Sequence, residues 1–136
     1  MKRNLTYVLF GIAALYISGC SVNGKVTDFS QIETSLNNMH LEENPCLKVY
    51  HGGAVREIPL KSISSVSIDP SNSKTIEDEL FYSGEVVLVN GGRITPQNDN
   101  KTTVFISVQN ILTGKNNGQS FKIGLENVSR ITIDKK

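Results

Sequence analysis

The chain has 136 residues, 38% of them hydrophobic, a formal net charge of +1 and no tryptophan. This length and composition are typical of one compact globular domain and exclude a disordered chain. Basic and acidic residues are balanced without a basic run, so the chain lacks the field that attracts nucleic acid or anionic lipid surfaces by charge alone.

The chain begins with a predicted secretory leader at residues 1–19. Lys2 and Arg3 precede an apolar run of 11 residues from Tyr7 to Ile17. A secretory signal needs an apolar run of roughly 7 to 15 residues, whereas a membrane-spanning helix needs about 20. Removal of this leader would leave 12 of the 14 basic residues against all 13 acidic ones, a net charge of −1.

The apolar run ends in the sequence I-S-G-C, from Ile17 to Cys20. An aliphatic residue, two small residues and a cysteine resemble the lipobox of bacterial lipoproteins. The resemblance implies that the Cys20 thiol accepts diacylglycerol, that a peptidase cuts before Cys20, and that the new amine can also be acylated. Two or three acyl chains, at about 0.8 kcal/mol per buried CH₂, hold a protein stably on a membrane. An ordinary cleaved signal peptide, or an uncleaved anchor, is the alternative.

Ser21 follows the cysteine at the position where Gram-negative lipoproteins kept in the inner membrane commonly carry aspartate. The resemblance therefore favours the outer membrane, with the domain facing the periplasm. The polar stretch from Ser21 to Thr27, which contains Gly24, predicts a tether of at most about 25 Å. The predicted organisation is a signal peptide at 1–19, a lipidated cysteine and tether at 20–27, and a β-rich domain at 28–136.

A short amphipathic helix is predicted at the start of this domain. Apolar residues recur there at spacings of three and four, namely Phe29, Ile32, Leu36 and Met39. This spacing places them on one helix face, and Ser30 with Glu33 fits a capping box. We expect the helix to cover one end of a β core, and a helix that binds a partner is the alternative.

After Pro45 the pattern changes to strands separated by turns. The predicted strands cover residues 47–50, 54–60, 64–69, 80–90, 93–95, 102–112, 119–125 and 129–134. Gly52-Gly53 and Gly91-Gly92 turn the chain within two hairpins, and the polar segment 70–73 ends the strand before it. The expected fold is a small antiparallel β barrel or sandwich of about eight strands with a short N-terminal helix.

Two segments of the chain resemble each other. Ile58 to Asp69, I-P-L-K-S-I-S-S-V-S-I-D, matches Ile123 to Asp134, I-G-L-E-N-V-S-R-I-T-I-D, at 5 of 12 positions. In both segments the apolar alternation skips three residues after a leucine, which predicts a 3₁₀-like turn between two strands. Small SH3-like barrels end in this way, so the pattern favours two related SH3-like β units. Chance likeness is the alternative.

The chain offers few groups for catalysis or metal binding. Nucleophilic catalysis requires a base near the nucleophile, and the two histidines, His40 and His51, lie close to Cys46 in sequence. However, His51 stands beside two glycines in a predicted turn, and Cys46 follows Pro45 in a predicted loop. Their irregular spacing also does not match a structural zinc site. We therefore predict no catalytic residues, no metal and no cofactor.

Two further groups of reactive side chains have structural interpretations. Once Cys20 is lipidated, Cys46 has no disulfide partner within the chain, and its burial as a small hydrophobe is favoured over a bond to another chain. Glu77, Asp78 and Glu79 precede a strand and indicate a solvated loop rather than an acid–base pair.

These features favour a membrane-anchored envelope lipoprotein that acts as a non-catalytic binding or assembly module. A second hypothesis is a carrier of a small apolar or lipid ligand in a β barrel, although the chain has only 4 tyrosines and 5 phenylalanines with which to line one. A third is an enzyme that depends on Cys46. The expected partners are the membrane, through Cys20, and an envelope protein, but not nucleic acid.

Overall fold

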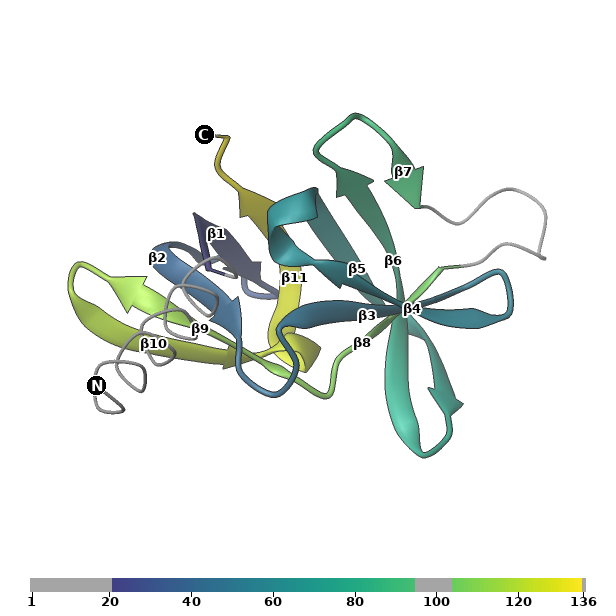
Figure 1. Ribbon diagram of the computed structural model, residues 1–136. Helices are drawn as coiled ribbons and strands as arrows, with labels where there is room; N and C mark the ends of the chain where they lie inside the picture. The colour runs from purple at the N-terminus through teal and green to yellow at the C-terminus, as the bar shows by residue number, and fades with distance from the viewer. Residues whose placement is uncertain (1–20, 95–103, 136) are drawn as a thin grey trace, which may run out of the picture.

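A computed structural model describes residues 21–94 and 104–135 (Figure 1). The predicted leader, Cys20, Thr95 and the first two residues of the strand predicted at 102–112 lie outside these ranges. The described chain forms an antiparallel sheet of eleven strands that does not close. The elements are β1 (Val22–Asp28), β2 (Glu33–Leu41), β3 (Cys46–His51), β4 (Ala54–Pro59), η1 (Leu60–Ser62), β5 (Ile63–Ile76), β6 (Glu79–Leu88), β7 (Arg93–Ile94), β8 (Phe105–Ser107), β9 (Ile111–Asn116), β10 (Gln119–Gly124), η2 (Leu125–Asn127) and β11 (Val128–Ile133).

The sheet consists of two halves, which lie side by side in Figure 1. The terminal half has the order β10-β9-β2-β1-β11, and the central half has the order β5-β6-β8-β3-β4, with β7 paired to β6. Pairing of β11 with β5 joins the halves. The central half comes from one stretch of chain, 46–107, whereas the terminal half combines strands from before and after that stretch.

The two halves contain the same run of elements. β3 begins at Cys46 and β9 begins at Ile111, 65 positions later. The same offset relates β4 to β10, η1 to η2, and the first residue of β5 to that of β11. The 3₁₀ turn predicted after each leucine of the repeated segment is therefore confirmed at both places.

The strands that pair with β11 and β5 also correspond. β1 pairs with β11 so that Gly24 opposes Ile133, and β6 pairs with β5 so that Gly84 opposes Ile68. A Cβ atom on Gly24 would overlap the carbonyl oxygen of Thr132, and a Cβ on Gly84 would overlap that of Ser67. Each half therefore needs glycine at the same point, where two backbones approach closely.

One hydrophobic cluster contains buried side chains from both halves. Leu60 and Leu125, the leucines of the repeated segments, have relative exposures of 1% and 0%. The adjacent Lys61 and Glu126 are exposed. The shared register expected from the sequence repeat is therefore confirmed.

The helix predicted at the start of the domain is wrong, because these residues form a turn and strand β2. The Asp28 carboxylate accepts hydrogen bonds from the backbone N–H groups of Ser30 and Ile32, and this contact makes the turn. In β2 a bulge places two residues, Asn37 and Asn38, opposite one residue of β1, so Leu36 and Met39 both face the core. The helix-like spacing of three is the spacing across this bulge.

The tether predicted from Ser21 to Thr27 is also wrong, because Val22 already begins β1. This strand pairs with β2 on one side and β11 on the other. Val22 and Val26 are buried while Asn23 and Lys25 are exposed, which is the alternation of a strand. Gly24 occupies the inward position between the two valines and hid this alternation in the sequence.

Two further predicted strands have the wrong bounds, and one of them is two strands. β5 does not end at the polar segment 70–73 but continues to Ile76 after a register shift, in which Asp69 pairs with Ser83 and Ser73 with Tyr82. The strand predicted at 102–112 is split, because residues 108–110 leave β8 and cross to β9 in the other half. The hairpins turned at Gly52-Gly53 and Gly91-Gly92 are both present.

Candidate functional site

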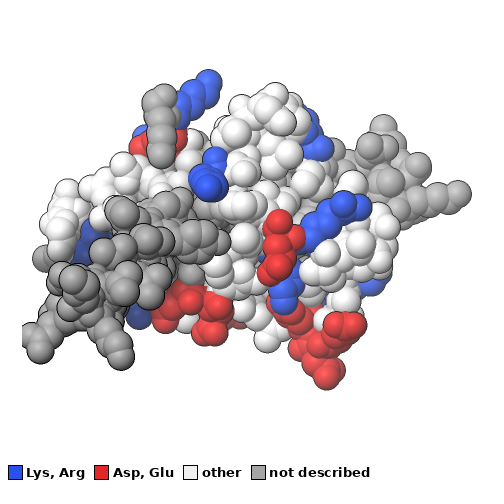
Figure 2. All heavy atoms as spheres, in the orientation of Figure 1, with Lys and Arg blue, Asp and Glu red and all other residues white. Residues whose placement is uncertain are grey.

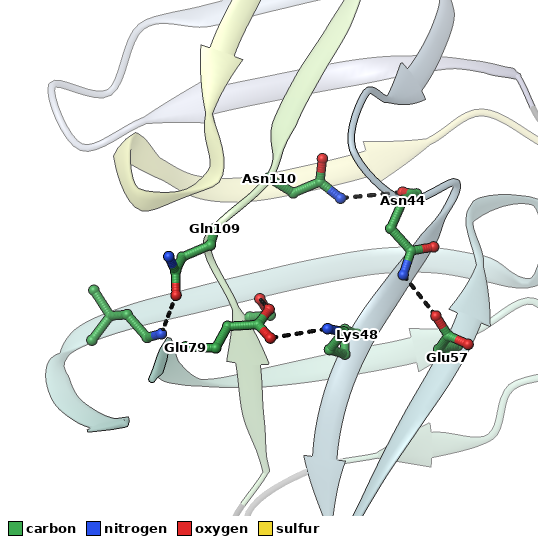
Figure 3. A network of polar contacts seen from close by, with 8 residues as sticks. Asn44, Lys48, Glu57, Glu79, Gln109 and Asn110 are labelled. Atoms are coloured by element: carbon green, nitrogen blue, oxygen red, sulfur yellow. Dashed lines mark hydrogen bonds and ion pairs between the residues drawn. The ribbon is translucent and has the colours of Figure 1, made fainter. Parts of the chain in front are cut away.

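The two segments that cross between the halves, 42–45 and 108–110, are hydrogen-bonded to each other (Figure 3). The side chain of Asn110 accepts a hydrogen bond from Glu43 N–H at 2.8 Å and donates one to the carbonyl oxygen of Asn44 at 3.1 Å. Its backbone carbonyl accepts a hydrogen bond from Leu125 N–H at 3.0 Å. Asn110 therefore joins both crossings to the second 3₁₀ turn, η2.

A polar cleft of about 290 Å³ opens at this junction. The residues that line it are Glu43, Asn44, Leu47, Lys48, Glu79, Ser107, Gln109, Asn110 and Leu125. They come from both halves of the sheet and from both crossings. The repeated architecture thus brings segments far apart in the sequence to one place.

Glu79 is the central charged group of this cleft. Lys48 Nζ lies 2.9 Å from Glu79 Oε1, and the Ser107 hydroxyl donates a hydrogen bond to Glu79 Oε2. The side chains of Lys48 and Glu79 are 33% and 26% exposed. Burial raises the pKa of Glu79, but the hydrogen bonds from Ser107 and Lys48 and the charge of Lys48 outweigh it, so the pKa lies below its ordinary value.

The position of Glu79 follows from the turn before it. Glu77 and Asp78 adopt positive φ angles of 51° and 66°, and both are exposed at the tip of the β5–β6 hairpin. Glu79 then begins β6 on the same face as Phe81, two residues further on. The predicted solvated loop is confirmed for Glu77 and Asp78, but it is wrong for Glu79.

The polar contacts continue on both sides of the ion pair (Figure 3). The side-chain oxygen of Gln109 accepts a hydrogen bond from Leu80 N–H at 2.6 Å. The side chain of Asn44 donates to Glu57 Oε1 at 2.6 Å, and its oxygen accepts from Cys46 N–H at 3.0 Å. Within the described ranges, every buried side-chain nitrogen and oxygen has a hydrogen-bond partner.

Aromatic rings cover the sheet face that carries this ion pair. Phe81 and Phe105 are 1% and 7% exposed, and neither belongs to the main hydrophobic cluster. Lys74 Nζ lies 5.2 Å from the ring centroid of Tyr50 and 5.7 Å from that of Phe105, within cation–π distance. The far part of the β5–β6 hairpin is therefore held against β3 and β8 by charge and by ring contacts.

This arrangement does not activate a nucleophile. Ser107 is only 4% exposed, and its hydroxyl donates to a carboxylate whose pKa is lowered, which makes that carboxylate a weaker base. Lys48 is paired with the same carboxylate. The geometry fits a network of contacts that fixes the hairpin against β3 and β8.

The residues considered for catalysis from the sequence do not converge. Cys46 and His51 are the first and last residues of β3, about 16 Å apart along the strand and on opposite faces. Both are half-buried, whereas His40 is exposed on β2 in the other half, with Nδ1 2.9 Å from the carbonyl oxygen of Asn38. In residues 21–94 and 104–135, no group of three or more His, Cys, Asp and Glu side chains is placed to hold a metal ion.

A larger groove of about 960 Å³ lies beside Ser21. Its lining comes from the start of β1, the β2 bulge, η1 and the start of β5, the β6–β7 turn, and the end of β11 with the residues after it. Val22, Ile63 and Ile133 are the buried apolar residues of this lining, while Val89 is 63% exposed. The groove therefore has an apolar floor at the end of the domain nearest to Cys20.

Comparison of the sequence with protein-family models gives no match, and comparison with curated proteins gives no relative. The part of the chain that the structure describes contains no helix with the length and hydrophobicity to cross a membrane.

Proposed function

We propose that this protein is a cell-envelope lipoprotein, held by lipid on Cys20 at the periplasmic face of the outer membrane, that acts as a non-catalytic binding or assembly module. The observation that carries the proposal is the lipobox-like sequence from Ile17 to Cys20, one residue before a folded β domain. The paired, unactivated side chains of the polar cleft support binding rather than turnover.

We also propose that each half of the sheet is an SH3-like unit. Both halves contain a strand, a 3₁₀ turn and a strand in succession, which is how small SH3-like barrels end. Since such folds host many unrelated functions, the proposed role does not rest on this likeness. The proposed role is supported instead by the open sheet: among the residues that the structure describes, its outermost strands, β4 and β10, each pair along one edge only, and a partner strand could add to the other.

The anchor is tested by replacing its thiol. Cys20→Ser should abolish incorporation of labelled palmitate and block processing of the leader, because lipobox chemistry needs the cysteine sulfur. Cys46→Ala, in the same strain, should be labelled as the wild type is. Equal labelling of the Cys20→Ser variant would contradict the proposal.

The binding role is tested by separating tethering from folding. A folded form secreted into the periplasm without lipid should weaken the in-cell phenotype, because it loses local concentration near a membrane partner. Crosslinking followed by purification from native membranes should recover an envelope protein with the wild type and less of it with the unlipidated form. Loss of function in a lipidated, folded Cys46→Ala or His51→Ala variant would instead favour an enzyme.

The carrier hypothesis has one specific observation in its favour, the groove of about 960 Å³ with its apolar floor. A carrier must keep its ligand after leaving the membrane. Organic extraction of the purified unlipidated form, followed by mass spectrometry, should therefore yield a stoichiometric lipid if the protein is a carrier, and none if it is a binding module.

A further inference from the structure

We propose that the end of the domain around this groove, which we call the anchor pole, rests on the membrane, with anionic phospholipid headgroups filling the groove. This inference rests on the proposed lipidation of Cys20. It adds an orientation and a second, non-covalent contact with lipid.

The first argument is the short distance between the anchor and the fold. Ser21 alone separates Cys20 from Val22, and two residue steps span at most about 7 Å. β1 cannot move away from the rest of the domain, because it is paired on both edges. Asp134 N–H also donates to the carbonyl oxygen of Asn23 at 2.9 Å, which ties β1 to the end of β11. Lipid on Cys20 therefore holds the whole anchor pole at the membrane interface.

The second argument is the chemistry of the groove. Lys61 and Lys135 are both exposed in its lining, and Asp134 is the one acidic residue among the described lining residues. Val89 adds an exposed apolar side chain on the β6–β7 turn, and its N–H donates to the carbonyl oxygen of Ser62 at 2.9 Å. Cationic groups beside apolar surface suit the headgroup region of an anionic leaflet.

The third argument concerns charge across the molecule. On the face drawn in Figure 2, most acidic side chains lie along the lower edge and near the middle, and one acidic group lies at the top, by the end of β11, where Asp134 follows the strand. The mature chain has a net charge of only −1, but long-range attraction to the membrane is not required once the lipid anchor holds the domain there. The proposed lipid anchor holds the groove with its two lysines at the interface, and charges interact there over about 10 Å, the screening distance at 0.1 M salt.

This orientation places the polar cleft away from the membrane. Ile133, at the end of β11, lines the groove, whereas Leu125, in the turn before β11, lines the cleft. The six residues of β11, from Val128 to Ile133, separate the two by about 20 Å. The cleft and the β5–β6 hairpin would thus face the periplasmic partner.

The test uses single tryptophans, because the chain has none of its own. Val89 and Ile32 are 63% and 62% exposed, and both lie in hairpin turns, but Ile32 lies beyond the far end of β1. Full-length lipidated Val89→Trp and Ile32→Trp proteins are reconstituted in vesicles of phosphatidylethanolamine and phosphatidylglycerol that contain brominated lipid. We expect a blue-shifted emission and several-fold stronger quenching for Val89→Trp. Equal quenching of the two variants, or none for Val89→Trp, would overturn the inference.

Two changes in the Val89→Trp background test the two causes separately. A flexible Gly/Ser spacer of eight residues inserted after Ser21 should reduce the quenching, because it frees the pole from the interface. Lys61→Glu together with Lys135→Glu should reduce it in phosphatidylglycerol vesicles, and unchanged quenching would exclude the anionic contact. Mass spectrometry of the Cys20 peptide separates the proposals: absence of lipid refutes the proposed function, whereas lipid without quenching refutes only the docked pole.

Discussion

The equivalence of the two halves predicts a large loss of stability at each of the two repeated leucines. Leu60→Ala and Leu125→Ala each remove a side chain that is 1% and 0% exposed, respectively. Substitutions of this kind cost about 2 to 5 kcal/mol, from lost transfer energy plus the cavity left behind. Leu125 also lines the polar cleft, so water can enter part of the vacated space, and its loss should fall toward the lower end. Leu60 should fall toward the upper end.

Urea unfolding followed by circular dichroism measures these losses, with Lys61→Ala and Glu126→Ala as neighbouring exposed controls. The controls should change the free energy of unfolding by roughly 0.5 kcal/mol or less. At about 4 °C per kcal/mol, the leucine variants should also melt roughly 8 to 20 °C lower. If both leucine substitutions left the free energy of unfolding unchanged, the shared register would be refuted. If only one did, the equivalence of the halves would be refuted.

Three further predictions concern single residues. Gly84→Ala should cost about 2 kcal/mol or more in urea unfolding, because its Cβ would overlap a backbone carbonyl, whereas Gly124→Ala, with ordinary contacts, should be nearly neutral. Since the pKa of Glu79 is lowered in the fold, its carboxylate stabilises the protein above the unfolded pKa and loses that effect as pH falls through the folded one. Glu79→Gln should therefore cost about 1 kcal/mol at pH 7 and progressively less as the pH falls through the lowered pKa of Glu79, and a pH-independent loss would contradict this. Cys46→Ala should leave the in-cell phenotype intact, and loss of that phenotype in a folded, lipidated variant would count against the binding role.

The sequence revealed those parts of the fold that depend on neighbouring residues. The two glycine pairs that turn hairpins, and the skip of three residues after Leu60 and Leu125, are local signals with local causes. A bulge or a glycine at a core position changes the spacing of apolar residues, so the sequence pattern then predicts the wrong element. The bulge in β2 made Leu36 and Met39 look helical, and Gly24 made strand β1 look like a tether.

The polar cleft could not be predicted because its members meet only through tertiary structure. Lys48, Glu79 and Ser107 come from three strands and are separated by 28 to 59 positions. Their approach depends on the order β6-β8-β3, which no local pattern specifies. Glu79 belongs to the run of three acidic residues from Glu77 to Glu79. The β5–β6 hairpin register places Glu79, alone of the three, in a strand where its carboxylate contacts Lys48 and Ser107.

The division of the sheet into a central and a terminal half also sets an order of folding. All strands of the central half are present once residues 46–107 have been made. By contrast, β1 pairs with β11, and the Ser129 hydroxyl donates a hydrogen bond to the carbonyl oxygen of Thr27. A chain made from its N-terminus contains β1 early, but β1 gains its partner β11 only after the central half and the β9–β10 hairpin have been made. A product cut short before β11 would leave the facing edges of β1 and β5 unpaired, and unpaired strand edges invite misassembly. The terminal half therefore reaches its full set of strands only after the whole central half has been made.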